Sequence, residues 1–319
     1  MNHFPGKVIV VITGPTAVGK TSYAIGAAKR FSGEIVSADS MQIYKYMDIG
    51  SAKPTPMEMS EVRHYLVDEI DPREPFSVAE YQQRAKDVIS SIHAKGKLPI
   101  ISGGTGLYIN SILYDLDFSR SEKRDDRRNQ LMKEAELEGK DFIHNKLRKL
   151  NPDMAERIHP NNIKRVIRAI EVIETTGKNI PEFSQSYLPT KDYSFVLIGL
   201  NRDRPELYHR IDNRVDELIE MGLKKEVMTL LEMGLQEANI SMKGIGYKEI
   251  IDHLKGRYDM DEAIRLIKRN TRHYAKRQIT WFNKDPNIFW INISRYKSDE
   301  EAFSYMVEYL KENLRRNKD

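Results

Sequence analysis

One short segment limits the possible folds of this chain more than any other. Residues 14–21 read Gly-Pro-Thr-Ala-Val-Gly-Lys-Thr, which matches the phosphate-loop pattern G-x-x-x-x-G-K-[ST] in full. The segment directly follows a β-branched run at 7–13 and directly precedes a helical pattern at 20–31. A strand, a glycine loop and a helix in this order bring backbone N–H groups and a helix N-terminus around a phosphate. The sequence therefore predicts an α/β fold that binds a diphosphate or a triphosphate.

The residues of this loop have distinct expected parts in phosphate binding. The glycines let the backbone curl around oxygen atoms, Lys20 supplies a positive charge, and the Thr21 hydroxyl can coordinate Mg²⁺. The alternative is a glycine-rich turn that only caps the helix, but the strand before it and the helix after it favour phosphate binding. The predicted phosphate-binding residues are Gly14, Pro15, Thr16, Ala17, Val18, Gly19, Lys20 and Thr21.

Strand and helix patterns alternate along the rest of the first hundred residues. A helix is predicted over 78–94, where Ser77 and Glu80 form a capping box. Short apolar runs predict the other strands, at 35–37, 64–67, 98–102, 195–200 and 288–293. Such alternation predicts a parallel sheet of the phosphate-loop type, flanked by helices.

The pattern changes after Tyr114. Residues 117–139 are dense in charged residues with helical spacing of Leu and Met, which indicates a helical insertion. We expect the insertion to span 117–158 and the core to comprise 1–116 and 159–319, with a strong amphipathic helix at 162–176 and a mostly helical C-terminal part. A closing helix is predicted near 300–314.

Composition and charge limit the setting of the protein. The 319 residues include no cysteine, so disulfides, thiolate zinc sites and a cysteine nucleophile are excluded. No apolar run approaches the length of a membrane span, and the N-terminus lacks the pattern of a signal peptide. We therefore expect a cytoplasmic protein without membrane or disulfide partners. We also expect a monomer, although composition does not bear on the oligomeric state.

Two further segments end predicted strands and point to the same edge of the sheet. Asp39 follows the second strand, at the edge where open α/β folds bind ligands, although an Asp there can also be a simple turn residue. Thr105 lies in a second glycine-rich turn, at 102–108, where its hydroxyl can donate to an oxyanion or cap the next helix. From position alone, both readings stay open for each residue.

Basic residues mark two places in the C-terminal part. Arg210 and Arg214 lie four residues apart on one predicted helix face, where one of them could bind a diphosphate or both could pair with nearby acids. The stretch 265–284 carries Lys and Arg without any acid, interleaved with aromatic residues, which is typical of a nucleic-acid surface. Trp281 and Phe282 of this stretch could equally belong to the core.

Seven segments taken in order resemble one family. GPTAVGKT, DSMQIYKYMDIGSAKP, SGGTGLY, IHPNNIKRVIRAIEV, RIDNRV, KGIGYKE and RHYAKRQITWF are similar to the motifs of bacterial tRNA dimethylallyltransferases, also called tRNA isopentenylpyrophosphate transferases. The resemblance covers nearly the whole chain. It implies transfer of a dimethylallyl group from dimethylallyl diphosphate to the exocyclic amine of the adenosine 3′-adjacent to the anticodon of a tRNA. In this family the phosphate loop holds the diphosphate, with Mg²⁺, instead of ATP.

The resemblance also implies roles for individual residues. Asp39 would accept a proton from the adenine amine, and Thr105 would hydrogen-bond the bridging oxygen as it leaves. Lys20, Thr21 and Arg214 would offset the charge that develops on pyrophosphate, where Arg214 is chosen over Arg210 only by the family pattern.

Contacts to the tRNA anticodon stem-loop follow from the same resemblance. Because the target base is stacked in the anticodon loop, it must be extruded into a channel. The residues implied in tRNA binding are Asp39, Ser40, Met41, Gln42, Thr105, Arg127, Lys164, Arg165, Arg168, Lys243, Gly246, Tyr247, Lys276, Arg277 and Gln278.

Two features of the sequence depart from the family pattern, and two other activities are compatible with the phosphate loop. Tyr46 stands where many members have glycine, and the chain cannot carry the cysteine-based zinc finger of eukaryotic relatives. One alternative is an adenylate isopentenyltransferase acting on free nucleotide, which the insertion and the basic tail argue against. Another is a small-molecule kinase or a nucleotide-gated RNA-binding protein, since phosphate loops are common.

Overall fold

The computed structural model describes residues 7–116, 125–176 and 188–316. The chain divides into two compact units. One comprises Met1–Asp115 with Leu188–Asp319, and the other comprises Leu116–Tyr187.

The first unit is built on a six-stranded sheet in the order β3-β2-β4-β1-β5-β6. Every neighbouring pair of strands is parallel, which confirms the predicted fold class. The central strand β1 is buried along its whole length, as its uninterrupted apolar sequence predicts for a strand covered on both faces. The strands are β1 (Val8–Thr13), β2 (Gly33–Ser37), β3 (His64–Tyr65), β4 (Leu98–Gly103), β5 (Ser194–Asn201) and β6 (Phe289–Asn292).

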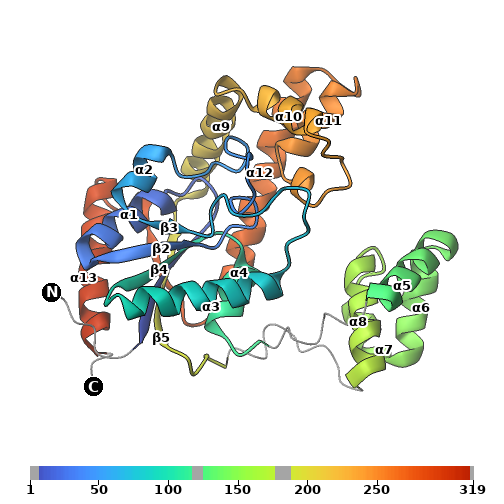
Figure 1. Ribbon diagram of the computed structural model, residues 1–319, viewed down its shortest axis with the longest axis horizontal. Coiled ribbons are helices and arrows are strands. Elements are labelled where there is room, and N and C mark those ends of the chain that lie inside the picture. The colour runs from blue at the N-terminus through green and yellow to red at the C-terminus, as the bar shows by residue number, and fades with distance from the viewer. Residues whose placement is uncertain (1–6, 117–124, 177–187, 317–319) are drawn as a thin grey trace. The chain divides into compact units, whose positions relative to one another are not determined.

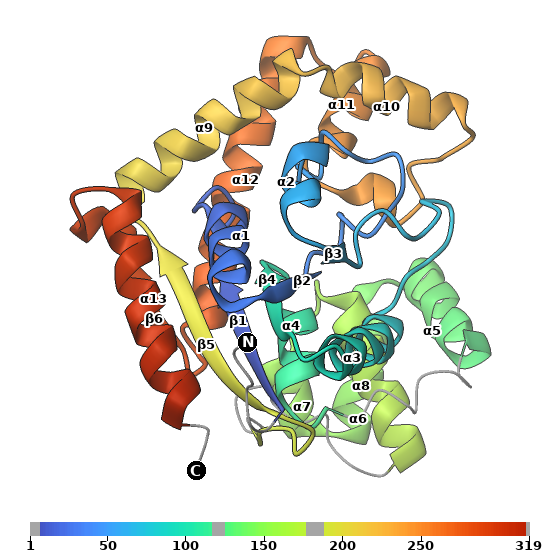
Figure 2. The same cartoon turned by 60° about the vertical axis from the view of Figure 1, so that its left-hand side comes forward.

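Helices cover both faces of this sheet. Helices α1 and α13 share one apolar core with alternate residues of the strands, and Figure 2 shows α13 alongside β5. Helix α3 packs against α4, β2 and β4, and its Tyr81 donates a hydrogen bond to the carbonyl of Ser37. The bounds of these helices are α1 (Lys20–Phe31), α3 (Val78–Ala94), α4 (Gly106–Leu113) and α13 (Asp299–Arg316), and the short helix α2 (Pro56–Glu61) lies between β2 and β3 in the chain.

The remaining helices of this unit extend beyond the carboxyl edge of the sheet (Figures 1 and 2). Helix α12 packs against α9 and α11. Helix α9 also lines a cavity together with the phosphate loop. These elements are α9 (Arg204–Glu220), α10 (Leu223–Glu232), the 3₁₀ turn η2 (Ser241–Lys243), α11 (Tyr247–Leu254), α12 (Met260–Phe282) and the 3₁₀ turn η3 (Ile293–Arg295).

The third strand is shorter than its sequence predicts. The apolar run at 64–67 predicts a strand of four residues, but only His64 and Tyr65 pair with β2. Leu66 and Asp68 have positive φ angles of 58° and 61°, and left-handed backbone cannot continue a strand. The apolar side chain of Leu66 is buried in the core, but its backbone does not continue the strand.

The second unit consists of α5 (Asp125–Glu138), α6 (Lys140–Leu150), α7 (Pro152–Arg157) and α8 (Ile163–Thr176). These helices share their own apolar core, to which α8 contributes Val166, Ile167 and Ile170. The predicted insertion boundary at 158 is therefore wrong, because α8 packs on α5 and α6 and belongs to this unit. Its amphipathic pattern predicted a buried face but not the partner of that face.

Candidate active site

The phosphate loop has the backbone geometry that its sequence predicts. Gly14 and Gly19 have φ angles of 145° and 110°, which favour glycine. A Cβ at Gly14 would lie 2.3 Å from the carbonyl oxygen of Leu200 in β5, so a side chain cannot be accommodated there. Ala17 also has a positive φ of 63°. The loop is thus held in a curled conformation between β1 and α1.

Lys20 is enclosed by this loop. Its Nζ donates hydrogen bonds to the carbonyl oxygens of Gly14 at 3.1 Å and Pro15 at 2.8 Å. Burial lowers the pKa of Lys20 to about 8, Asp39 raises it in part, and the positive charge of Arg214 lowers it. An anion in the loop would stabilise the protonated amine, so the site favours binding of phosphate.

Two arginines hold consecutive carbonyl groups of the loop from outside. Arg210 Nε donates to the carbonyl of Ala17 at 3.0 Å, and Arg202 Nε donates to the carbonyl of Val18 at 3.2 Å. The C=O and N–H groups of a trans peptide point in opposite directions. The N–H groups of Val18 and Gly19, which share peptide units with these two carbonyls, therefore point away from the arginines. Arg210 thus shapes the loop, and among the described residues it forms none of the ion pairs considered from the sequence. The part played by Arg202 has no signal in the sequence.

Asp39 follows β2 and forms a turn while lining the site. Its Oδ1 accepts hydrogen bonds from the backbone N–H of Met41 at 2.8 Å and of Gln42 at 3.4 Å. Within the described residues, Oδ2 makes no hydrogen bond. The two readings considered from the sequence are therefore compatible: one carboxylate oxygen stabilises the turn, and the other is available to a ligand.

The glycine-rich turn after β4 is tied to the Asp39 turn. Thr105 is the N-cap residue of α4, but its hydroxyl does not cap the helix and instead accepts a hydrogen bond from Ser40 N at 3.0 Å. Its backbone N–H donates to the carbonyl of Ala38 at 3.1 Å. Thr105 does not line either of the cavities that Asp39 lines. Its expected contact with the leaving oxygen stays a prediction.

Two adjoining cavities meet at Asp39 and Arg214. One, of about 390 Å³, is lined by the phosphate loop, including Lys20 and Thr21. The other, of about 470 Å³, is bounded largely by apolar side chains of the C-terminal helices. Burial lowers the pKa of Arg214, which lies on α9. The residues common to both cavities are Thr16, Asp39, Ser51, Ala52, Arg214 and Leu218.

A carboxylate that the sequence did not single out holds one wall of both cavities. Glu226 of α10 accepts hydrogen bonds from the backbone N–H groups of Asp48, Ile49 and Gly50 at 2.7 to 2.9 Å. It also accepts the hydroxyl of Tyr247 at 2.9 Å. The loop it holds contributes lining residues to both cavities.

In the same region Tyr46, which stands where the sequence resemblance suggests glycine in many members, has a positive φ of 65°. The backbone at this position is therefore in the left-handed region that favours glycine, although the residue is tyrosine.

The residues of the first unit that are expected to bind tRNA differ in where their side chains lie. Some face the larger cavity: Ser40, Met41, Lys243, Gly246 and Arg277. Gln42 lines the smaller cavity, and Lys276 is exposed one residue before Arg277. Tyr247 and Gln278 are instead buried, at 0% and 5% exposure. Their side chains serve contacts within the protein.

The residues expected to bind tRNA in the second unit lie on α5 and α8. Lys164 and Arg165 are exposed on α8. Arg127 forms a bidentate ion pair with Glu174, at 2.9 and 2.7 Å, and the Arg168 guanidinium lies 3.6 Å from Glu171.

The basic stretch 265–284 is partly neutralised by acids from neighbouring positions. Arg265 pairs with Glu262. Lys268 and Arg272 pair with acids on α9, Asp216 at 2.7 Å and Asp212 at 2.5 Å. No carboxylate pairs with Lys276 or Arg277 in the part of the chain that the structure describes. The expected cationic surface is therefore narrower than the sequence suggested.

Two aromatic residues of the same stretch, Trp281 and Phe282, contact the protein itself. Phe282 is 2% exposed. A Cβ at Gly106 would lie 2.2 Å from the ring of Trp281, so this ring rests on the backbone at the start of α4.

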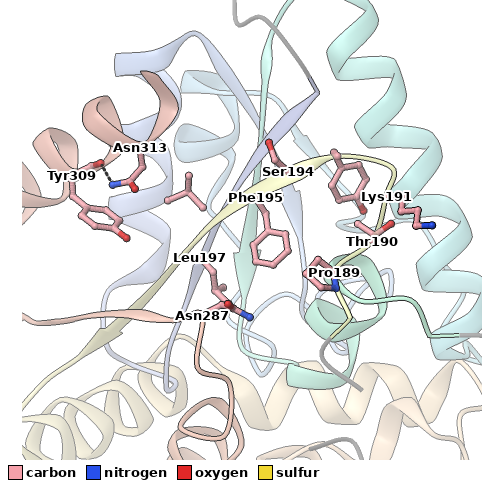
Figure 3. A pocket seen from close by; sticks show the side chains of 11 residues that line it. Pro189, Thr190, Lys191, Ser194, Phe195, Leu197, Asn287, Tyr309 and Asn313 are labelled. Carbon is pink, nitrogen blue, oxygen red and sulfur yellow. Dashed lines mark hydrogen bonds between the residues drawn. The ribbon is translucent and has the colours of Figure 1, made fainter. Parts of the chain in front are cut away.

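A further cavity of about 640 Å³ lies at the opposite end of the sheet, at the start of β5 (Figure 3). It is lined by Ser194, Phe195 and Leu197 of β5 and by Asn313 of α13. Among the described residues that line it, Lys191 is the one charged residue, whereas the phosphate-loop cavity is lined by both Lys20 and Arg214.

Neither a metal cluster nor a membrane span is evident in the described residues. Among them, no group of three or more His, Cys, Asp or Glu side chains could hold a metal ion. None of the helices in this part of the chain is long and apolar enough to cross a membrane.

Comparison with known proteins gives one consistent family. The tRNA dimethylallyltransferase of Alkaliphilus oremlandii is 52% identical over 305 residues, covering 96% of this chain and 97% of the relative. That of Clostridioides difficile is 49% identical over 307 residues, covering 96% and 98%.

Solved structures agree with these relatives. The full-length tRNA isopentenylpyrophosphate transferase of Bacillus halodurans has a TM-score of 0.75 and 40% identity, covering 98% of each chain. A eukaryotic dimethylallyltransferase acting on tRNA has a TM-score of 0.84 and 28% identity, covering 98% of this chain and 80% of that one. The family model described as IPP transferase matches residues 42–285. With its phosphate loop, its paired cavities and these relatives, the chain belongs to the IPP transferase family.

Proposed function

We propose that this protein is a tRNA dimethylallyltransferase. It transfers a dimethylallyl group from dimethylallyl diphosphate to the N6 amine of the adenosine 3′-adjacent to the anticodon, and releases pyrophosphate. The observation that carries this proposal is that Asp39 and Arg214 line both the phosphate cavity and the larger apolar cavity. A diphosphate in one cavity and a purine in the other would meet at these two side chains.

The donor end is supported by the charges around the phosphate loop. Lys20 and Arg214 would neutralise the diphosphate, and their partial burial strengthens this interaction relative to water. As the bond between the allylic carbon and the bridging oxygen breaks, negative charge increases on pyrophosphate. Fixed cations at that position lower the barrier because they stabilise the transition state more than the ground state.

The magnesium ion expected with a diphosphate would be held by the Thr21 hydroxyl and the phosphate oxygens. Thr21 lies in the first turn of α1 and lines the phosphate cavity, which fits this role. When bound, the ion supplies further positive charge to the pyrophosphate.

The acceptor end depends on Asp39. The N6 lone pair is delocalised into the purine ring, so the amine is a poor nucleophile until its proton is removed. Asp39 Oδ2 would accept this proton as the new N–C bond forms. The turn formed by Oδ1 with Met41 and Gln42 holds the carboxylate in place for that step. Thr105 would orient the same turn through Ser40 and hydrogen-bond the leaving oxygen.

The tRNA would approach from the side of the larger cavity. Lys243 and Arg277 line this cavity, and Lys276 is exposed beside it. We propose that these cations contact backbone phosphates of the anticodon stem-loop, with Lys164 and Arg165 of the second unit as further contacts. The base itself must leave its stack to reach Asp39.

The decisive test is a product assay with three acceptors. The purified protein is incubated with dimethylallyl diphosphate, Mg²⁺ and an unmodified tRNA transcript, with AMP, or with a transcript carrying guanosine at the target position. We expect prenylated adenosine, detected by mass spectrometry of digested nucleosides, only from the first. Prenylation of AMP would establish an adenylate isopentenyltransferase, and phosphoryl transfer from ATP without prenylation would establish a kinase.

A further inference from the structure

Gln278 of α12 connects two loops that come from distant parts of the sequence. Its side chain is 5% exposed. Its Oε1 accepts a hydrogen bond from the backbone N–H of Thr16 at 2.9 Å, and its Nε2 donates one to the carbonyl of Gly104 at 2.9 Å. One amide group therefore spans the phosphate loop and the glycine-rich turn after β4.

The orientation of this amide is determined by its partners. A backbone N–H can only donate and a carbonyl can only accept, so Oε1 must face Thr16 and Nε2 must face Gly104. A Cβ at position 104 would lie 2.2 Å from Nε2. Glycine at this position thus lets the turn approach the amide closely.

The two ends of the bridge belong to the two halves of the site. Thr16 lies in the phosphate loop and lines both cavities. Gly104 precedes Thr105, whose hydroxyl accepts the N–H of Ser40 next to Asp39. Helix α12 also carries Arg277 in the wall of the larger cavity. A shift of the Gln278 amide would therefore move the diphosphate site relative to the proton acceptor.

We propose that Gln278 is a positioning residue for prenyl transfer and that it does not contact the RNA. It holds the phosphate loop and the Thr105 turn at the separation that aligns the allylic carbon with the adenine amine. This inference rests on the proposed function. It replaces the expectation from the sequence that Gln278 binds tRNA, because the side chain is buried and its Oε1 and Nε2 each form a hydrogen bond with the protein backbone.

Gln278→Glu tests this role with an almost unchanged shape. An ionised carboxylate can still accept from Thr16 but cannot donate to Gly104, so the bridge is broken at one end. Reaction rates fall by about 10²-fold when reacting groups are displaced by about 1 Å. We expect kcat to fall by about 10- to 100-fold, while KM for dimethylallyl diphosphate and for tRNA changes little.

Protonation should restore the bridge in this variant. A neutral carboxylic acid accepts through one oxygen and donates through the other, as the amide does, and burial favours the neutral form. We expect the ratio of variant to wild-type kcat to rise as the pH is lowered from about 8.5 to about 6, and dividing by wild type removes titrations common to both proteins. The elements around Gln278 carry other ionisable side chains, among them Lys20, Asp39, Tyr108, Arg214, Tyr274, Lys276 and Arg277.

The experiment measures kcat, both KM values and the pH profile of wild type, Gln278→Glu and Gln278→Met. The methionine variant has similar length but no titratable group, so it should lose kcat without recovering at low pH. Gln83→Glu, at an exposed position of α3, is the matched control and should behave as wild type. Thermal melting checks that each variant is folded.

Each outcome bears on the inference separately from the proposed function. A raised KM for tRNA with unchanged kcat would show that Gln278 contacts RNA and would overturn the inference. Unchanged kinetics in both variants, or a loss without recovery at low pH in Gln278→Glu, would overturn it as well. If Gln278→Glu does not fold and Gln278→Met does, a kcat of Gln278→Met equal to that of the wild-type protein would overturn the inference. Failure of the wild-type protein to prenylate tRNA would instead reject the proposed function.

Discussion

The ammonium group of Lys20 donates a 2.8 Å hydrogen bond to the carbonyl oxygen of Pro15 in its own phosphate loop. It is therefore placed among backbone dipoles, without a carboxylate among its hydrogen-bond partners in the described residues. Burial consequently lowers its pKa to about 8. A bound diphosphate would reverse this effect, because the nearby negative charge favours the protonated amine.

Lys20 should make substrate capture depend on pH. Below about pH 8 the amine is protonated, so kcat/KM for dimethylallyl diphosphate should be flat, and above it kcat/KM should fall about tenfold per pH unit. The decline in kcat should begin at higher pH, since the bound diphosphate raises the pKa of Lys20. Titration calorimetry with pyrophosphate near pH 8 should show proton uptake.

The same group should lower stability in the absence of ligand. Because the folded-state pKa lies below the unfolded value of 10.5, the unfolded chain binds more protons between about pH 8 and 10.5. Burial of the protonated amine therefore lowers the free energy of unfolding by its full amount below about pH 8. This effect disappears above pH 10.5, where the amine is neutral in both the folded and the unfolded chain. Lys20→Met should therefore raise Tm at pH 7 while abolishing pyrophosphate binding. Lys29→Met, at an exposed position of the same helix, should do neither, and an equal rise in Tm there would contradict the assignment.

Asp39→Asn separates proton acceptance from turn formation. The amide Oδ1 can still accept the N–H groups of Met41 and Gln42, so the turn is preserved. We expect kcat to fall by about 10²-fold or more, the usual scale for loss of a general base. Binding of tRNA and the melting temperature should be unchanged. Asp192→Asn, in a surface ion pair, is the control. Turnover near the wild-type level would remove Asp39 from the mechanism.

Neutralising Lys276 and Arg277 together should weaken tRNA binding in a salt-dependent way. Each lost phosphate contact reduces the magnitude of the negative slope of log K against log salt by about 0.7 on single strands and about 0.9 on duplex. Filter binding at several salt concentrations measures this slope. Arg265→Gln is the matched control, because Arg265 is paired with Glu262 and should leave the slope unchanged. A slope that does not respond to the double variant would place the RNA elsewhere.

Glu226→Gln should loosen the loop that lines both cavities. In the wild-type protein the carboxylate accepts hydrogen bonds from the N–H groups of Asp48, Ile49 and Gly50. Glutamine replaces one of the two accepting oxygens with an NH₂ group, which cannot accept these bonds. Loss of such partners costs about 1 to 3 kcal/mol in the free energy of unfolding. We expect that loss in urea unfolding, together with a raised KM for dimethylallyl diphosphate. Glu232→Gln, exposed on the same helix, should change neither. Equal effects of both variants would argue against the anchoring role.

Several features of this protein follow from local sequence alone. Helices α1 and α3 have the bounds that their patterns predict, because a glycine loop and a capping box are each formed by residues within one or two turns. The phosphate loop is similarly local, since its N–H groups, its lysine and its threonine are consecutive. The position of Asp39 beside the phosphate loop could be predicted because the strands of a parallel sheet end at one edge, so the residues that follow them converge.

Tertiary structure decided which distant groups meet. Arg202, Glu226 and Gln278 act on loops that lie far away in the sequence, and no spacing pattern connects such partners. An amphipathic helix such as α8 encodes a buried face but not the surface that covers it, which is why the insertion boundary was misplaced. A run of lysines and arginines predicts positive charge, but it does not show that acids on another helix neutralise part of that charge. Local sequence determines the backbone conformation because the hydrogen bonds involved join residues close in the chain. Contacts between distant residues form only when the chain packs into its tertiary structure.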